Sequence, residues 1–258
     1  MEKTALSLSG TNDYLIRHGD RYVLIDTGYE EDWELFQRQL AQHQVRLAAL
    51  SHILLTHHHD DHAGLLNRIV RENPAIRIVM SQHAPDLLAK GENDRTHGGG
   101  MINAQVARLW GLKQWYLSFR LGRWVQKNNN LKFPPYLGRE NDILVTRETR
   151  LKDLGLELDG VLFDSPGHSI DSLSILFDDG DCFVGDAAAN FLQFAGTRYC
   201  IIFISDLDEY YRSWEKILAR GARHIFPAHG EPFPAVKLQD NLGKNRQEAM
   251  VLLTPGAR

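Results

Sequence analysis

Apolar residues recur along the chain with two different periods, and these periods predict its strands and helices. Tyr14–Arg17 and Tyr22–Asp26 are short apolar runs typical of strands, and His18-Gly19-Asp20 between them predicts the turn of a hairpin. Residues 30–43 carry apolar side chains at near-helical spacing among charges, which predicts a surface helix. The chain therefore begins with a β-hairpin followed by a helix.

The same two periods predict further strands and helices, in an order that is similar in the two halves of the chain. In the first half, a strand is predicted at Ile53–Leu55, where it runs directly into a histidine cluster, followed by a helix at Ala63–Glu72 and a buried strand at Ile76–Met80. The second half resembles the first in order. Its strands are predicted at Leu156–Phe163, Ser172–Phe177, Cys182–Val184 and His224–Phe226, with a helix at Leu207–Arg220. Two similar halves predict two sheets packed face to face with helices outside, a four-layer αββα sandwich.

A segment of different character, about Gly91–Asp142, separates the two halves. It has helical patterning over residues 101–126, eight basic against four acidic residues, and three of the five tryptophans: Trp110, Trp115 and Trp124. We interpret it as a helical insertion in a single domain that spans residues 1–258. One hypothesis is that it covers the site like a lid, with an apolar wall and a cationic rim. The other is that its tryptophans only pack the segment onto the body.

Composition and charge exclude several classes of protein. The 258 residues are 43% hydrophobic and 24% charged, as in an ordinary globular protein long enough for a large core. The net charge of -4 gives no sign of a nucleic-acid or membrane partner, and no oligomeric state is indicated. No apolar run approaches the roughly 20 residues needed to span a bilayer. Since Met1–Tyr14 lacks the pattern of a secretory leader, we expect a cytoplasmic protein.

The two cysteines, Cys182 and Cys200, are too few for a disulfide framework. Cys182 lies in an apolar, strand-like run, which predicts a small buried hydrophobic residue rather than a reactive thiol.

The strongest chemical signal is the run His57-x-His59-x-Asp61-His62, which begins at a strand end and enters a helix. In an extended stretch, residues i and i+2 point the same way, so His57 and His59 can hold one ion. Asp61 and His62 then project from the helix start toward a neighbouring position. Imidazole suits zinc, iron and similar metals, and a carboxylate neutralises charge. The spacing therefore predicts a metal site.

Three further residues that suit metals each follow a predicted strand. His168 stands in Ser165-Pro166-Gly167-His168-Ser169, Asp186 in Phe183-Val184-Gly185-Asp186, and His229 in Pro227-Ala228-His229-Gly230. Glycine-flanked polar residues often only make turns. Together with the first run, however, they make seven candidate ligands at strand ends, where α/β sheets commonly build their sites.

This combination resembles the metallo-β-lactamase-fold superfamily over nearly the whole chain, from Asp26-Thr27-Gly28 to His229-Gly230. The resemblance implies that His57, His59 and His168 hold a first metal. It implies that Asp61, His62 and His229 hold a second, and that Asp186 bridges the two. Asp26 would orient ligands rather than bind metal. His58 and Asp60 fall between ligand positions and are interpreted as non-ligands.

The resemblance also implies two divalent cations, of which zinc is the first expectation, with iron and manganese accepting the same ligands. A hydroxide that bridges two metals would attack the substrate, and Asp61 and Asp186 would offset the charge and accept or shuttle the proton. The predicted enzyme is a metallo-hydrolase acting on an ester, lactone or thioester bond. Its expected substrate is a small molecule that combines an anionic group with an apolar part.

Several residues of this chain differ from those typical of known branches of the superfamily, and these differences limit the reactions that we expect. Class B β-lactamases carry cysteine, or lack the carboxylate, at the position of Asp186, which argues against β-lactam hydrolysis. His59 stands where flavodiiron oxygen reductases usually have glutamate. Acyl-homoserine lactonases usually carry tyrosine three residues after the bridging aspartate, where this chain has Ala189. The short tail after His229 leaves no room for the C-terminal domain of glyoxalase II, so only a general thioester hypothesis remains.

Three alternatives stay open. A phosphodiesterase or nuclease would use the same dinuclear site and would cleave phosphodiesters faster than esters or lactones. A mononuclear iron dioxygenase resembling persulfide dioxygenases would hold about one iron per chain. A non-catalytic metal-binding protein is the third, although no member of the ligand set is missing.

Overall fold

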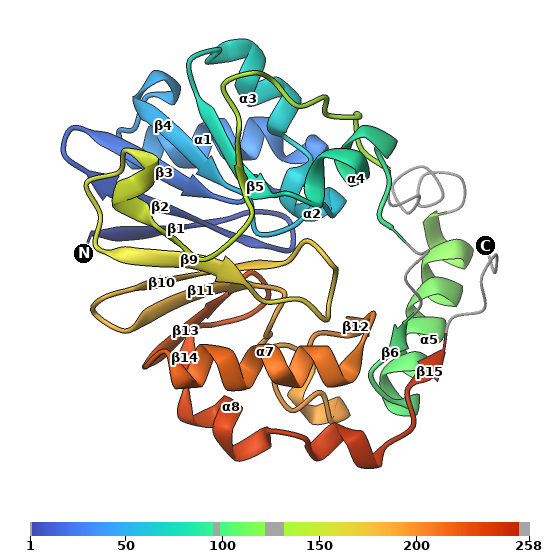
Figure 1. Ribbon diagram of the computed structural model, residues 1–258. Helices are drawn as coiled ribbons and strands as arrows, with labels where there is room; N and C mark the ends of the chain where they lie inside the picture. Colours follow the sequence, from blue (N-terminus) through green and yellow to red (C-terminus); the bar gives the residue numbers. More distant parts are fainter. Residues whose placement is uncertain (1, 95–98, 122–131, 253–258) are drawn as a thin grey trace.

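Two six-stranded sheets lie face to face in the centre of the molecule, with helices on both outer sides (Figure 1). The structure is a computed structural model that describes residues 2–94, 99–121 and 132–252, without the side chains of residues 114–121. This arrangement confirms the predicted four-layer sandwich.

The first sheet has the order β1-β2-β3-β4-β5-β7. Its first three strands pair antiparallel, and β3, β4, β5 and β7 run parallel, so their carboxyl ends share one edge. The strands are β1 (Lys3–Ser7), β2 (Asn12–His18), β3 (Arg21–Ile25), β4 (Leu50–Leu54), β5 (Arg77–Ser81) and β7 (Ile143–Val145).

The second sheet has the order β14-β13-β11-β10-β9-β8. Within it, β11 and β13 are parallel, and the remaining pairs are antiparallel. The strands are β8 (Thr149–Arg150), β9 (Gly160–Asp164), β10 (Leu173–Phe177), β11 (Asp181–Gly185), β13 (His224–Pro227) and β14 (Phe233–Pro234).

Alternating side chains of each strand fill two different cores. On β2, Tyr14 and Ile16 point into the core between the sheets, which they share with Ile175 and Phe183 of the second sheet, whereas Leu15 faces the helices. The first outer layer consists of α1 (Trp33–Gln42), α3 (Leu66–Glu72) and α4 (Ala84–Lys90), and the second of α7 (Leu207–Ala219) and α8 (Val236–Asn241). The period-two pattern of the strands therefore produces the four layers.

The inserted segment joins the second half through a small third sheet. Strand β6 (Gly100–Met101) pairs with β12 (Phe203–Ile204) and with β15 (Val251–Leu252), and helix α5 (Ala104–Leu121) follows it. Ile102 and Val106 are buried in the same core as Tyr210 and Trp214 of α7. Trp124 and the end of the predicted helix lie outside the described residues. The single domain and the lid stay predictions.

Most predicted elements differ from the structure by a few residues at their ends, and two of these differences have a clear structural cause. The helix predicted at Ala63–Glu72 is divided into α2 (Asp60–Ala63) and α3, because the Gly64 N–H donates to Gly28 O at 3.0 Å. A Cβ at Gly64 would lie 2.7 Å from that oxygen, so only glycine permits this approach. The strand predicted from Leu156 begins only at Gly160, because its partner β10 ends at Phe177, opposite Gly160.

Within the described residues, no helix is both long and apolar enough to span a membrane. Cys182 and Cys200 are free thiols with no exposed surface. The prediction that Cys182 is a small buried hydrophobic residue is confirmed.

We expect neither thiol to react with a soluble disulfide reagent at pH 8 in the folded protein. Burial raises the pKa of Cys200 to about 12 and raises that of Cys182 further, so the reactive thiolate is scarce as well as inaccessible. Thiol titration before and after addition of guanidinium checks this. Two thiols should react only after unfolding, and fast labelling of the native protein would contradict the buried positions.

Candidate metal centre

The predicted site residues lie where strands of the two sheets end. His57, His59, Asp61 and His62 follow β4 and enter α2. In the second half, His168 follows β9, Asp186 follows β11 and His229 follows β13. The structure brings all seven residues together in three overlapping groups of potential metal ligands: His57, His59 and His168; His57, His62 and Asp186; Asp61, His62 and His229.

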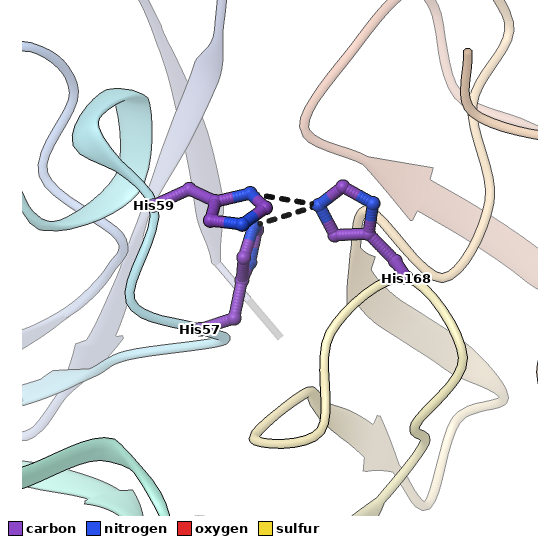
Figure 2. Close-up of side chains that lie close together, drawn as sticks. All are labelled: His57, His59 and His168. Atoms are coloured by element: carbon purple, nitrogen blue, oxygen red, sulfur yellow. Dashed lines mark hydrogen bonds between the residues drawn. The ribbon is translucent and has the colours of Figure 1, made fainter. Parts of the chain in front are cut away.

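Three histidine nitrogens meet at one point (Figure 2). His168 Nε2 lies 2.9 Å from His59 Nδ1 and 3.2 Å from His57 Nε2. His57 and His59 come from the first half of the chain and His168 from the second, so the group spans the two sheets. We call these residues the three-histidine group.

A second group contains two histidines and a carboxylate. Asp61 Oδ2 lies 3.2 Å from His229 Nε2, and Asp61 Oδ1 lies 3.7 Å from His62 Nε2. We call Asp61, His62 and His229 the mixed group.

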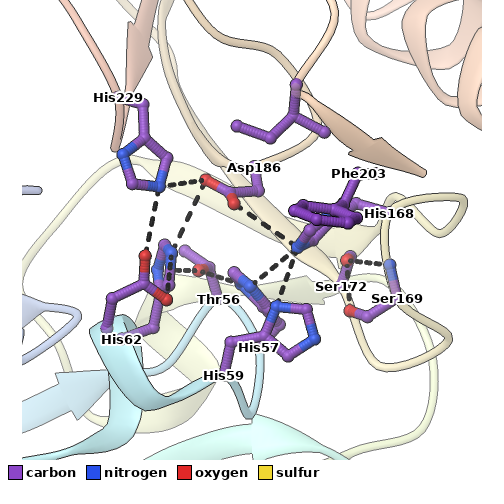
Figure 3. A network of polar contacts seen from close by, with 12 residues as sticks. Thr56, His57, His59, His62, His168, Ser169, Ser172, Asp186, Phe203 and His229 are labelled. Carbon is purple, nitrogen blue, oxygen red and sulfur yellow. Dashed lines mark hydrogen bonds and ion pairs between the residues drawn. The ribbon is translucent and has the colours of Figure 1, made fainter. Parts of the chain in front are cut away.

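Asp186 faces both groups with its two oxygens (Figure 3). Its Oδ2 lies 3.4 Å from His168 Nε2 in the three-histidine group. Its Oδ1 lies 3.4 Å from His229 Nε2 and 3.5 Å from His62 Nε2 in the mixed group. The carboxylate therefore stands between the groups, as the bridging prediction requires.

The outward nitrogens of four histidines are each fixed by an oxygen that is not a candidate ligand. His168 Nδ1 donates to Phe203 O and His229 Nδ1 to Gly10 O, both at 2.8 Å. His62 Nδ1 lies 2.8 Å from Asp26 Oδ2, and His57 Nδ1 lies 3.1 Å from Thr56 Oγ1. These contacts turn the inward nitrogens toward one another, the arrangement that orients metal-binding imidazoles.

Burial and charge separate the histidines into two kinds. Burial and the neighbouring imidazoles hold the pKa of His57 and His59 well below the usual range, so their lone pairs are free. Burial also lowers the pKa of His229, but Asp186 and Asp61 raise it by more, to about 10. The mixed group, with its carboxylates, therefore attracts positive charge, and the three-histidine group offers neutral donors.

The donor set fits divalent metal ions. His62 Nε2 and Asp186 Oδ1 are buried, and neither has a hydrogen-bond partner among the residues that the structure describes. A buried polar atom without a partner costs roughly 1–3 kcal/mol, and a cation between the two groups would remove that cost. A cation among the three nitrogens of the three-histidine group would also attract a lone pair from each of them. Imidazole and carboxylate are the donors that zinc, iron and manganese accept.

Thr56 and Asp26 join the site to the strands behind it. Asp26 Oδ1 accepts from Thr56 N and Asp26 Oδ2 accepts from Thr56 Oγ1, both at 2.8 Å. A Cβ on Gly185, which has φ +50°, would lie 2.4 Å from Thr56 Oγ1. Glycine next to Asp186 therefore lets β11 approach the first sheet closely. The predicted orienting role of Asp26 agrees with these contacts.

Several supporting residues were not predicted from the sequence. Thr56 and Asp171 have no pattern of their own, although Thr56 directly precedes His57. The carbonyls of Gly10 and Phe203 are main-chain groups, for which a sequence carries no signal. Tyr210 Oη donates to Asp186 O at 3.0 Å and Trp214 Nε1 to Ala187 O at 2.5 Å, so α7 supports the loop that carries Asp186.

A family model described as the metallo-beta-lactamase superfamily matches residues 6–229. The chain belongs to the metallo-β-lactamase superfamily. A β-lactamase-like protein 2 homolog of Drosophila melanogaster is 27% identical over 254 residues, which are 96% of this chain and 69% of that protein. Thioesterase pkgB of Emericella nidulans is 36% identical over 100 residues, which are 36% of this chain and 28% of that protein.

Solved structures of the superfamily share the fold. A metallo-β-lactamase family protein of Thermus thermophilus has a TM-score of 0.63 at 18% identity, covering 95% of this chain and 79% of that one. The match to the fungal thioesterase spans little more than a quarter of that protein. Membership of the superfamily confirms the resemblance inferred from the sequence.

We expect Asp26→Asn to weaken metal binding roughly 10- to 100-fold, as is typical of residues that orient ligands. The amide places a donor where Thr56 and His62 now donate to a carboxylate. Titration against a chromophoric chelator measures the affinity. Asp142→Asn is the control, since this buried carboxylate pairs with Arg139 at the other edge of the sheet. Equal affinities for both variants would contradict the orienting role.

Proposed function

We propose that this protein hydrolyses an acyl bond, a thioester before an ester or a lactone, at a site for two divalent metal ions. The observation that carries the proposal is Asp186, whose two oxygens lie 3.4 Å from His168 in one group and 3.4 Å from His229 in the other. A carboxylate shared between two complete donor sets supports two adjacent cations rather than one.

The ligands follow from the geometry. The three-histidine group would hold one ion, the mixed group would hold the other, and Asp186 would touch both. Zinc is the first choice for a site of this composition, and iron and manganese accept the same donors.

Two cations held there supply Lewis acidity for the addition of water to a carbonyl carbon. The protein contributes orientation and charge. Phe203 O and Gly10 O set the planes of His168 and His229. Although burial alone would raise the pKa of Asp186, three histidines hold it well below the usual range, so the carboxylate is ionised. Asp61 and Asp186 offset positive charge, and the role of either as acceptor of the proton from the attacking water stays a prediction.

The alternatives are less well supported. A mononuclear dioxygenase would need only one donor set, whereas the mixed group is complete and His229 is oriented as firmly as His168. A phosphodiesterase would use the same two groups, so the choice of an acyl bond has other support. Two relatives with matching segments carry the name thioesterase.

We expect chelation to abolish hydrolysis and added zinc, manganese or iron to restore it. Asp186→Ala and His59→Ala should each lose at least about 100-fold in kcat/KM, more than the roughly 10- to 100-fold typical of residues that only orient ligands. His224→Ala, which changes an exposed histidine bound to Asp181, is the control. Undiminished activity in either site variant would show the proposed site to be wrong.

The same purified protein distinguishes the reactions when it is given thioesters, lactones, aryl esters and a chromogenic phosphodiester, with metal content measured in parallel. Thioesters should be turned over fastest, at two metal ions per chain. Faster cleavage of the phosphodiester would establish the alternative. One iron per chain with persulfide-dependent oxygen uptake would establish a dioxygenase.

The inserted helix supports an apolar substrate with an anionic group. The ring centre of Trp110 on α5 lies 5.5 Å from that of Phe203, edge to face, and Lys113 Nζ lies 4.9 Å from the Trp110 ring centre. Phe203 is also the residue whose carbonyl orients His168, and Figure 3 shows it beside that imidazole. The half-buried Trp110 and Phe203 therefore offer an apolar wall next to the three-histidine group, with a cation at its outer edge.

We expect Trp110→Ala to raise KM about 10-fold for a thioester of an aromatic acid, because an aromatic contact contributes roughly 0.5–1.5 kcal/mol beyond buried area. Hydrolysis of an acetyl thioester should not change. Lys113→Gln should reduce the preference for acyl groups with a free carboxylate by roughly 2- to 5-fold, as expected for an exposed ion pair. Leu112→Ala, on the same helix and 62% exposed, is the control. Equal effects on both thioesters would exclude the wall.

A further inference from the structure

The residues between the candidate ligands face away from the site and are themselves bound. His57 and His59, in the extended run after β4, point toward the site, whereas the side chains of His58 and Asp60 contact other parts of the chain. His58 is 1% exposed and Asp60 8% exposed, so neither is a solvent-facing spacer.

The His58 ring is held at both nitrogens. The main-chain N–H of Asp94 donates to His58 Nε2 at 3.0 Å, which leaves the ring proton on Nδ1. His58 Nδ1 then donates to Asp171 Oδ1 at 2.9 Å. The ring therefore connects the run that carries His57 and His59 with the beginning of the inserted segment and with the second half of the chain.

Asp171 lies in the loop that carries His168. It is 1% exposed, and His58 is the partner of its Oδ1, while its Oδ2 is buried without a hydrogen bond. The loop is closed by Ser165 N donating to Ser172 O at 2.8 Å and by Ser169 Oγ, 2.7 Å from Ser172 Oγ. Because the loop is short and closed by its own hydrogen bonds, fixing Asp171 also restricts the position of His168.

A main-chain hydrogen bond beside the His58–Asp171 pair also joins the run after β4 to the second half of the chain. Leu173 N, at the start of β10, donates to Thr56 O at 2.8 Å. Thr56 precedes His57 and His58 precedes His59, so the two bonds to the second half alternate with the two candidate ligands from the first.

From this geometry we propose that His58 and Asp171 are positioning residues of the three-histidine group. Their pair fixes the loop of His168 relative to His57 and His59, so that nitrogens from two halves of the chain meet at one metal ion. The proposal rests on the proposed function, in which these three histidines bind metal. The role is separate from that of Asp26, which orients His62 in the mixed group.

The test measures metal binding rather than turnover. Asp171→Ala removes the acceptor for His58, and the affinity of one of the two metal ions should fall roughly 10- to 100-fold, with the other unchanged. Asp171→Asn keeps an acceptor for His58 Nδ1 and should restore most of the affinity. His58→Gln is a second route to the same loss if Asp171→Ala does not fold, since glutamine can accept from Asp94 N but does not reach Asp171 as a ring donor does.

The visible spectrum of the cobalt-substituted protein identifies which ion is affected. His229→Ala, which removes a member of the mixed group, provides the reference spectrum of an ion at the three-histidine group. Asp171→Ala should lose this signal and keep the complementary one. Asp181→Ala is the matched control, because this carboxylate is 5% exposed and pairs with His224 and Lys3 at the opposite end of β11. It should leave both metal affinities unchanged.

The outcomes separate the inference from the proposed function. If the unaltered protein binds no metal, the proposed function fails. If it binds two ions and both Asp171→Ala and His58→Gln bind them with unchanged affinity, the positioning role fails and the proposed function stands. If Asp171→Ala and Asp181→Ala lose affinity equally, the effect is general destabilisation, which also overturns the positioning role.

Discussion

The whole site depends on one unfavourable arrangement, in which imidazole nitrogens are held within 2.9–3.2 Å of each other in the interior. His168 carries its ring proton on Nδ1, so its Nε2 has a single lone pair and can accept a hydrogen bond from only one of its two neighbours. The other contact brings two lone pairs together, which is repulsive. The fold maintains it by fixing the outer nitrogens, as Phe203 O does for His168 and Thr56 Oγ1 contributes for His57. The same arrangement becomes favourable once a cation occupies the centre. The surrounding hydrogen bonds thus hold the imidazoles in positions from which they could bind a metal ion without rearranging.

The segment after β4 meets two requirements at once because extended chain alternates its side chains. One set of positions faces the site, and the side chains of the other set bond to the body of the protein. Thr56 Oγ1 donates to Asp26 Oδ2 at 2.8 Å, and His58 Nδ1 donates to Asp171 Oδ1 at 2.9 Å. A helical segment could not divide its residues in this way, since every third or fourth residue would return to the same face. Helix α2 therefore begins only at Asp60, after the extended residues 56–59 have placed alternate side chains toward the site and toward the body of the protein.

The sequence was sufficient for the candidate ligands and for most strands, because both are local patterns. His57 to His62 stand together in the sequence, and β10 and β11 contain the apolar runs Ile175–Phe177 and Cys182–Val184. What it did not predict depends on contacts between distant residues. The break at Gly64 arises from the carbonyl of Gly28, and the third sheet pairs Met101 with Phe203 and Val251. The partner of His58 is 113 residues away, so no spacing rule could have identified it.

The inserted segment contacts the candidate metal centre at two places. The segment begins at Asp94 against His58, behind the candidate ligands, and returns through Trp110 to Phe203, beside His168. Both ends of this path touch residues that position the three-histidine group, so the apolar wall and that group are placed by the same contacts. Under the proposed function, a substrate that fits the wall would lie next to the three-histidine group rather than the mixed group.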